Sequence, residues 1–546
     1  MTKIRRIVLL MLCLLTVLSG FLSCERGGSP GGGTENADAA SSDTATESET
    51  SGTGSQTGSG DQSEVIAMPS CLCEIIDTVN IEYVSTRPTF TVPSSLPEDK
   101  NEGVIDPHFT VGSSMVLQRR AVNLIRGRTT DAHVAVRFGG ETYYGTVADG
   151  RFEVYIPPME ADAGKDLVIL TDTAKKTLGN VCVGEVFLLG GQSNMVWPLG
   201  WSGSLHDADV QGATEENIRV LRMNHTESEY ERADAEGDVA WTPISPEVAK
   251  NLSAVGYLFG KRIHSELGIP VGLVQAAVSG STIAFWFPRD AYDEYIAGGG
   301  VAYSSQSSGN LVPCLGYNGM IAPLIGMRFR GMVWYQGETN TSDAAYYCRE
   351  LTKLIETYRE KFLSPLLSVT VVELPKSTAD RAEKWALVRA AQQEAAKTLG
   401  NVVLSVSIDL GYAADIHPRE KTEYARRAAE ATLAGFFGFD MPPFPEVVSA
   451  ERVSDTAVSL KLTGGSSFEL RNGARGFEVS ADGTTYVPAA GVELNGDTLL
   501  VSSDEPIRLV RYGVIYYDTE TADFTKHLTV FNAEGNPLDQ FVISPE

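Results

Sequence analysis

The sequence predicts a three-layer α/β/α domain that is flanked by two β-sandwich domains. Within residues 181–440, five short apolar runs alternate with segments that carry apolar residues at helical spacing, which is typical of a parallel sheet covered on both faces. On either side of this region, apolar and polar residues alternate in short runs separated by Gly-containing turns, which indicates antiparallel sheets. A chain of 546 residues is too long for one hydrophobic core, so several domains are expected.

The N-terminus reads as a targeting segment. Lys3, Arg5 and Arg6 precede the apolar segment 7–18, which is too short to span a membrane comfortably. The segment closes on Leu-Ser-Cys24, which resembles the lipobox of bacterial lipoproteins. That resemblance implies that Cys24 is lipidated; the alternative is a plain secretory signal cut nearby. In either case the protein is exported, and we expect a cell-surface or periplasmic lipoprotein of a bacterium.

The folded part of the chain begins and ends with expected β-structure. Gly139-Gly140 and Asp149-Gly150 are typical hairpin turns in the first part, and Asp482-Gly483 and Asn495-Gly496 in the last. The first sandwich is expected to contain strands at 121–125, 134–138, 142–147 and 152–156. The second is expected to contain strands at 447–448, 457–462, 476–480, 499–501 and 509–516.

The α/β region contains five short, mostly apolar runs that favour buried strands. The expected strands are residues 186–189, 271–276, 329–334, 366–372 and 402–408. The expected helices are 249–267, a segment with one apolar face over 347–362, 379–399 and 421–436. The resulting domains are a signal peptide at 1–24, a disordered Gly/Ser/Thr and acidic tether at 25–64, the N-terminal segment and sandwich at 65–180, the α/β domain at 181–440 and the C-terminal sandwich at 441–546.

Charge and cysteine content exclude two classes of function. A net charge of −26 would repel the phosphates of nucleic acid, so no nucleic-acid partner is expected. Cys71 and Cys73 have no Cys or His partner at zinc spacing, so no metal site is predicted. Cys314 and Cys348 flank the third expected strand and could form a disulfide.

Reactive side chains follow four of the five expected strands. Ser193 follows the first strand, residues 279–282 the second, residues 336–340 the third, and Asp409 with residues 415–418 the fifth. Ligands of open α/β sheets bind beyond the carboxyl ends of the strands. A hydroxyl, a small-residue turn, side-chain amides and an imidazole near acids are the components of a serine acyl-transfer site. Each component alone has a structural alternative, such as a helix cap or a surface histidine, but their joint placement favours the site.

Three motifs make the prediction more specific. Gly-Gln-Ser-Asn-Met at 191–195, Trp-Tyr-Gln-Gly-Glu-Thr-Asn at 334–340 and Ile-His-Pro at 416–418 resemble the signature blocks of the sialate O-acetylesterase family. This family consists of SGNH-type hydrolases, with a flavodoxin-like α/β domain, that remove acetyl esters from sugars. Further similarity lies at residues 114–118, 317–323 and 510–513.

The resemblance implies roles for the motif residues. Ser193 is the nucleophile, and His417 is the general base. The oxyanion hole is formed by the amides of Ser193 and Gly280 and by a side chain of the third block. Gln336 is favoured for that side chain, with Asn340 as the second choice.

The resemblance leaves the acid of the triad open. SGNH hydrolases usually place Asp three residues before the His, where this chain has Ala414. Asp415 is the preferred orienting group, Asp409 is the fallback, and a Ser-His dyad remains a third option. We expect Glu338 to be structural, paired with Arg330 or Arg389.

The expected activity is therefore that of a serine esterase on O-acetylated sugar or glycan, most simply sialic acid, through an acetyl-serine intermediate and without cofactor or metal. The alternatives are an acetylxylan-type polysaccharide deacetylase and a non-catalytic carbohydrate-binding surface lipoprotein. Contact with a membrane is expected only through the N-terminal lipid. Trp197, Trp286, Trp334 and Tyr317 lie near the motifs and could stack on sugar or fill the core.

Overall fold

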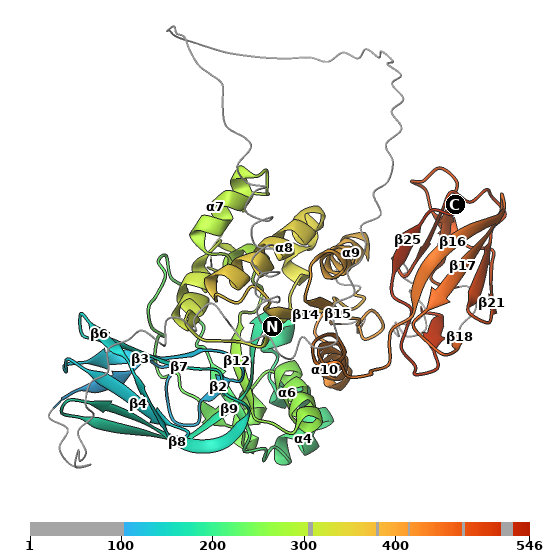
Figure 1. The fold of residues 1–546 in the computed structure, drawn as a ribbon. Coiled ribbons are helices and arrows are strands. Elements are labelled where there is room, and N and C mark those ends of the chain that lie inside the picture. Colours follow the sequence, from blue (N-terminus) through green and yellow to red (C-terminus); the bar gives the residue numbers. More distant parts are fainter. Residues whose placement is uncertain (1–102, 304–308, 378–381, 413–414, 472–474, 515–527) are drawn as a thin grey trace, which may run out of the picture. The chain divides into compact units, whose positions relative to one another are not determined.

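The computed structural model describes residues 103–303, 309–377, 382–412, 415–471, 475–514 and 528–546 (Figure 1). All of them fall within one compact unit, residues 68–546. Cys24, the tether at 25–64 and the Cys71/Cys73 pair lie outside the described residues, so what the sequence predicts about them stays a prediction.

The expected N-terminal strands are present in an antiparallel β-domain. One sheet has the order β1-β3-β7-β6, and β4 pairs with β5 and β8. The expected strand 142–147 is divided at Gly145, where a Cβ atom would lie 2.2 Å from the carbonyl oxygen of Glu153. The strands are β1 (Ile105–Pro107), β2 (Val116–Gln118), β3 (Asn123–Thr129), β4 (Val134–Phe138), β5 (Glu141–Tyr144), β6 (Thr146–Ala148), β7 (Arg151–Ile156) and β8 (Asp162–Thr171).

Strand β9 (Lys175–Gly191) joins the β-domain to the central sheet. Its first part pairs antiparallel with β8 and parallel with β2. Its last part pairs in parallel with β12 and β13. The expected domain boundary at residue 180 therefore falls inside a continuous strand, and Ser193 follows the end of that strand.

The central sheet has the order β11-β10-β12-β9-β13-β14-β15. All neighbours from β10 to β15 are parallel, and β11 is an antiparallel edge strand. The expected count of five parallel strands was wrong, because β10 is a sixth. Arg219 and Arg222 interrupt the apolar pattern of β10, although the Arg219 side chain is buried and donates to Asn180 Oδ1 at 3.1 Å. The strands are β10 (Ile218–Arg222), β11 (Thr242–Pro243), β12 (Val271–Ala277), β13 (Gly331–Tyr335), β14 (Ser368–Val372) and β15 (Val402–Ser405).

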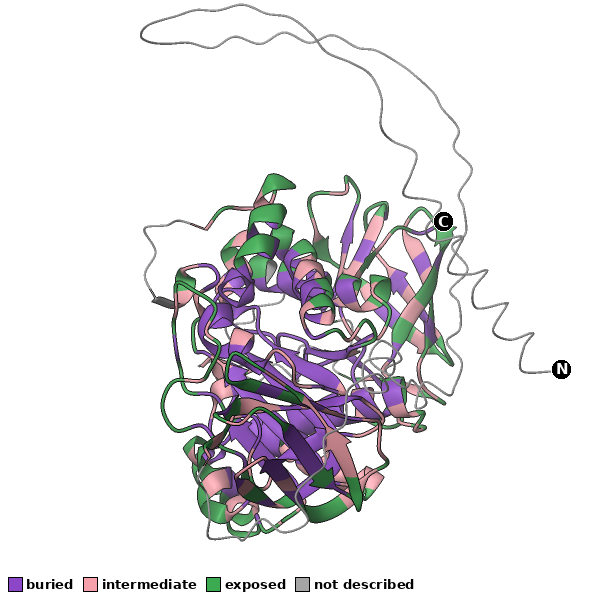
Figure 2. Cartoon of the chain, turned by 60° about the vertical axis from the view of Figure 1, so that its left-hand side comes forward, coloured by how far each residue is buried: buried purple, intermediate pink, exposed green. Residues whose placement is uncertain are grey.

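The helices pack in pairs beside this sheet. Helix α6 (Ala254–Leu267) packs against α10 (Thr422–Phe437), and α8 (Ala344–Lys361) packs against α9 (Ala382–Thr398). The helix expected at 249–267 is divided between α5 (Pro246–Asn251) and α6, because Ser253 caps α6 by accepting from the amide of Gly256. Figure 2 shows that buried residues are concentrated in the strands, while the helices turn exposed residues outward.

The C-terminal region is rich in β-structure, as expected, and has a hydrophobic core of its own. Two four-stranded sheets have the orders β16-β17-β22-β21 and β20-β19-β23-β25, and β18 pairs with β24. The strands are β16 (Glu446–Ser454), β17 (Ala457–Thr463), β18 (Phe468–Leu470), β19 (Phe477–Ser480), β20 (Val487–Pro488), β21 (Gly491–Asn495), β22 (Thr498–Ser502), β23 (Leu509–Tyr512), β24 (Val530–Asn532) and β25 (Phe541–Ile543).

Two further observations concern covalent links and membranes. Cys182, Cys314 and Cys348 are all unpaired, so the suggested disulfide between Cys314 and Cys348 does not form. Among the described residues, no helix is both long enough and apolar enough to cross a bilayer.

Candidate active site

Three neighbouring strands of the central sheet end at the same level. Gly191 at the end of β9 is in register with Ala277 at the end of β12 and with Tyr335 at the end of β13. The residues that follow these positions are therefore brought to one edge of the sheet. They include Ser193, Gly280 and Gln336, which the sequence places after separate strands.

The turn that presents Ser193 requires glycine at position 191. Gly191 has φ +139, and a Cβ atom there would lie 2.0 Å from the carbonyl oxygen of Tyr335. Ser193 is the first residue of the short helix α3 (Ser193–Val196). Its backbone amide belongs to the first turn, where amides have no partner within the helix, which suits the expected role in an oxyanion hole.

The structure assembles a Ser-His-Asp group from the two ends of the α/β domain. His417 Nε2 lies 2.9 Å from Ser193 Oγ, and His417 Nδ1 lies 3.1 Å from Asp415 Oδ1. The same Asp415 oxygen accepts the backbone amide of His417 at 2.9 Å. A hydroxyl bonded to an imidazole that is oriented by a carboxylate is the geometry of an activated serine nucleophile.

The fallback acid, Asp409, is engaged elsewhere. Its two carboxylate oxygens accept from Arg427 Nη1 at 2.5 Å and from Nη2 at 2.8 Å, and both side chains are buried. A bidentate buried ion pair fixes this carboxylate in place. Asp415, and not Asp409, is therefore the acid that contacts the imidazole.

The third signature block forms a buried hydrogen-bond network. Gln336 Nε2 lies 2.7 Å from Asn340 Oδ1 and 3.1 Å from both Gln192 Oε1 and the carbonyl oxygen of Ser281. Asn340 Nδ2 donates to Tyr303 Oη at 2.6 Å. Both amide side chains are fully buried, with acceptors already within reach. An oxyanion role for either one requires it to exchange a protein acceptor for the substrate oxygen, and these two assignments stay predictions.

Gly280 occupies the turn after β12. It has φ +71, is exposed, and has open space where a Cβ atom would be. The positive φ favours glycine at this position. Gly280 is thus located at the correct edge of the sheet for an amide donor, and its role in the oxyanion hole stays a prediction.

Glu338 is not paired with arginine, so that expectation was wrong. Its Oε1 accepts from Asn194 Nδ2 at 2.6 Å, and the nearby cation is Lys421. Arg389 instead donates to Gln540 Oε1 at 2.8 Å, and Arg330 donates to the carbonyl oxygen of Phe436. Burial raises the pKa of Glu338.

Lys421 and Asn194 are site residues that the sequence reasoning missed. Lys421 Nζ donates to Asn194 Oδ1 at 2.6 Å, and both side chains are fully buried. Burial lowers the pKa of Lys421 to about 7, against the opposing influence of Glu338 and Asp415. Asn194 stood inside the quoted motif, but a lysine just before an amphipathic helix carries no signal of burial.

Aromatic residues near the site fall into two groups. Trp286, Trp334 and Tyr317 are almost fully buried, so they belong to the core and are unavailable to sugar. Trp197 stacks on the His417 ring, with centroids 5.5 Å apart and planes at 19°. The Trp197 and Trp201 rings form a T-shaped pair with centroids 5.6 Å apart, and Trp201 is 64% exposed, so an open aromatic surface adjoins the site.

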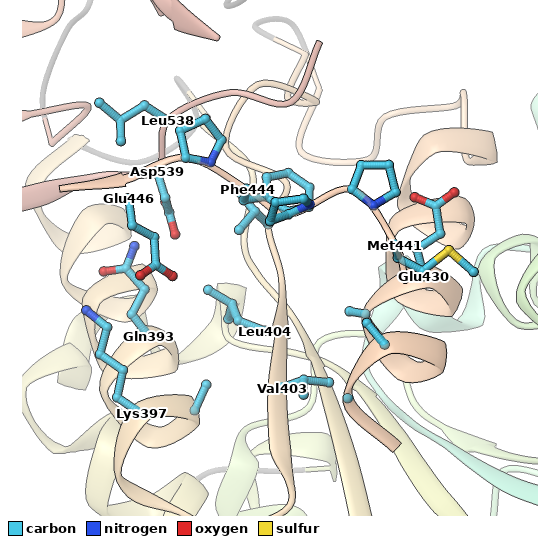
Figure 3. A pocket seen from close by; sticks show the side chains of 18 of the residues that line it. Gln393, Lys397, Val403, Leu404, Glu430, Met441, Phe444, Glu446, Leu538 and Asp539 are labelled. Carbon is cyan, nitrogen blue, oxygen red and sulfur yellow. The ribbon is translucent and has the colours of Figure 1, made fainter. Parts of the chain in front are cut away.

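Two other features of the described residues bear on ligands. No group of three or more His, Cys, Asp or Glu side chains is arranged to hold a metal ion in this part of the chain. A cavity of about 570 Å³ is lined by α9, β15 and α10 together with residues 441–447 and 538–541 (Figure 3). Neither Ser193 nor His417 lines it.

Comparison with known proteins shows a similarity that includes the candidate site. Residues 183–433 match the family described as "Carbohydrate esterase, sialic acid-specific acetylesterase". The matched segment contains Ser193, Asp415 and His417. This segment is similar to that family.

The relatives of this chain are similar to it over limited lengths. Sialate O-acetylesterases of Pongo abelii and Homo sapiens are 30% and 29% identical to the chain over 214 residues, which is 38% of this chain and 40% of each relative. The chain thus spans about two fifths of the length of the curated relatives that it matches. The crystal structure of a carbohydrate acetylesterase from Xanthomonas citri is 27% identical and has a TM-score of 0.71, covering 80% of this chain and 99% of that one.

Proposed function

We propose that this protein is a serine esterase that removes O-acetyl groups from sugars, with sialic acid as the favoured sugar. The observation that carries the proposal is the hydrogen-bonded series Ser193–His417–Asp415 in a segment similar to the carbohydrate esterase family. The relatives' printed names and the Xanthomonas citri structure support an acetyl ester of a carbohydrate as the substrate class.

The proposed reaction has two steps. His417 Nε2 takes the proton of Ser193 Oγ as that oxygen attacks the acetyl carbonyl carbon, and the same imidazole then protonates the departing sugar oxygen. His417 next takes a proton from water as the water oxygen attacks the acetyl-enzyme, and it returns that proton to Ser193 Oγ as the ester bond breaks and acetate leaves. The negative oxygen of each tetrahedral intermediate is stabilised by the amides of Ser193 and Gly280, with Gln336 as the side-chain donor.

The proposal includes a subsite for sugar at Trp201. Its exposed ring offers an apolar surface next to Trp197, which stacks on the catalytic imidazole. Aromatic faces bury large apolar area at low entropy cost and suit the apolar face of a pyranose ring. We also propose that the helix pairs α6/α10 and α8/α9 cover opposite faces of the sheet, as in the three-layer arrangement.

The proposal extends to export and anchoring. A basic start, a short apolar segment and a terminal Leu-Ser-Cys24 support lipidation of Cys24, and the acidic, Ser- and Gly-rich residues 25–64 suit a solvated tether. The enzyme would then be held outside the cytoplasm by its lipid alone.

Acetate release from a panel of acetylated sugars tests the function. O-acetylated sialic acids, acetylated xylan and 4-nitrophenyl acetate are incubated with the purified protein and with Ser193→Ala. We expect turnover of acetylated sialic acid that Ser193→Ala abolishes, together with a mass increase of one acetyl group on the parent protein after a rapid quench. Turnover of xylan but not of sialic acid would reassign the sugar, and equal acetate release by Ser193→Ala would refute the serine mechanism.

A further inference from the structure

Asn194 joins the helix that carries Ser193 to the loop that carries His417. Its Nδ2 donates to Glu338 Oε1 at 2.6 Å and to the carbonyl oxygen of Ile416 at 3.1 Å. Ile416 is the residue before His417. Asn194 thereby connects the two sides of the Ser193–His417 contact.

Lys421 determines which way the Asn194 amide faces. Lysine has only donor hydrogens, so Asn194 must present its oxygen to Lys421 Nζ, which lies 2.6 Å from Oδ1. This orientation leaves both amide hydrogens for Glu338 and the Ile416 carbonyl. If the amide were rotated by half a turn, oxygen would face oxygen at Ile416, and the link to the His417 loop would be lost.

The lysine is enclosed on its other sides by aromatic rings. Its Nζ lies 5.9 Å from the ring centroid of Trp197, 5.8 Å from that of Tyr335 and 5.1 Å from that of Tyr424. Ring faces stabilise a desolvated cation. Trp197 also stacks on His417, so Lys421 contacts two separate supports of the imidazole, Asn194 and Trp197.

The proposed acetyl transfer does not use Lys421, yet the cost of burying an amine is high. Within the described residues, the buried Lys421 amine has one hydrogen-bond acceptor and three neighbouring aromatic rings, and so specific an arrangement indicates a role. The acids that act on it are Glu338, on the third-block turn, and Asp415, on the loop of His417. Both belong to the site already described.

We propose that Lys421 is a positioning residue which, through Asn194 and Trp197, holds His417 within hydrogen-bonding distance of Ser193. This inference rests on the proposed function only in taking His417 as the base that activates Ser193. Lys421 does not touch the substrate. It fixes a geometry whose loss slows the attack by Ser193.

The test is Lys421→Met, which removes the amine and retains the length of the side chain. A displacement of about 1 Å at a reacting group can lower the rate about 100-fold. We therefore expect kcat for 4-nitrophenyl acetate to fall about 100-fold while KM changes less than twofold. We also expect labelling of Ser193 by a fluorophosphonate probe to slow by a similar factor, because that reaction requires the same base but no sugar.

Lys376→Met is the matched control. Lys376 is also buried, and burial lowers its pKa to about 7 as well, but its backbone amide donates to the Ile408 carbonyl oxygen and its charged neighbours are Arg389, Glu478 and Glu373. We expect the parent kcat and labelling rate in this variant. A comparable loss in both variants would show that any buried lysine is needed for folding, and would overturn the positioning role.

If Lys421→Met does not fold, the double variant Lys421→Met/Glu338→Gln tests the positioning role of Lys421 instead. It removes both charges but retains an oxygen that accepts from Asn194. A folded double variant with low kcat and slow labelling supports the proposal. A double variant, or a folded Lys421→Met, with the parent kcat and labelling rate overturns it, because Lys421 would then serve only to balance Glu338.

The labelling rate also separates this inference from the proposed function. If the parent protein is labelled at Ser193 but hydrolyses no acetylated sugar, the proposed substrate is wrong. The labelling rate of Lys421→Met then still tests whether Lys421 positions His417. If the parent is not labelled at all, then Ser193 is not activated and both proposals fail.

Discussion

The imidazole Nε2 of His417 lies 2.9 Å from Ser193 Oγ, although the two residues are 224 positions apart in the chain. One is placed by the tight turn after β9 and the other by the loop before α10. Their contact therefore depends on the sheet and on the polar side chains that join these two segments.

Asp415→Asn is expected to lower kcat strongly. Loss of the orienting carboxylate in a serine triad can cost about 10,000-fold, because the imidazole takes the wrong tautomer. Asp409→Asn should leave kcat of the folded protein unchanged and reduce stability by about 3–5 kcal/mol, since it breaks the buried pair with Arg427. Steady-state kinetics and urea unfolding of both variants make the comparison. The opposite ranking would move the acid to Asp409, and small kinetic effects from both would indicate a dyad.

Gln336→Ala is expected to lower kcat about 100- to 1000-fold if its amide stabilises the oxyanion. Gln336 also binds Asn340, Gln192 and the Ser281 carbonyl, so the thermal midpoint must be measured beside the kinetics. An intact kcat with a lowered midpoint would make Gln336 purely structural. Asn340→Ala would then be the next variant to test as the donor.

Trp201→Ala is expected to raise KM for acetylated oligosaccharide several-fold, because the exposed ring is proposed to stack on sugar. KM for 4-nitrophenyl acetate should not change, since that substrate has no sugar ring. Tyr230→Ala, which removes another exposed aromatic side chain, is the control and should alter neither value. Equal KM shifts for both substrates would contradict a sugar subsite at Trp201.

Lys376→Met is expected to stabilise the protein at pH 7. Burial lowers the Lys376 pKa from 10.5 to about 7, and within the described residues its Nζ has no hydrogen-bond partner. Between pH 7 and pH 10.5, Lys376 is protonated in the unfolded chain but mostly neutral in the folded protein. Its burial therefore lowers the free energy of unfolding near pH 7, and this destabilisation fades as the pH rises toward 10.5. Urea unfolding at pH 7 and pH 10 should show an advantage of the variant that shrinks with pH. A less stable variant at pH 7 would mean that the ammonium is compensated.

Cys24→Ala is expected to abolish lipid attachment. When cells that express the parent protein are grown with labelled palmitate, the parent should carry the label and appear in the membrane fraction. The variant should lose the label. Cys71→Ala, at another N-terminal cysteine, is the control and should remain labelled. A labelled Cys24→Ala protein would rule out the lipidation site.

The sequence by itself determined the strands and the residues that follow them. An apolar run closed by Gly190-Gly191 is local information, and it placed Ser193 correctly because a buried strand and a tight turn are encoded by neighbouring residues. The same reasoning located Gly280 and Gln336 at strand ends. The sequence pattern did not predict β10, because Arg219 and Arg222 interrupt the apolar run of this buried strand.

Only the tertiary structure decided which side chains contact each other. Asp409 and Asp415 are both acids close to His417 in sequence, but Arg427 on α10 takes the first and leaves the second for the imidazole. Lys421 carries no local signal of burial, yet it is buried against Asn194. The partner and the burial of a side chain are decided when segments distant in sequence pack together. A local sequence pattern does not contain the identity of those distant neighbours.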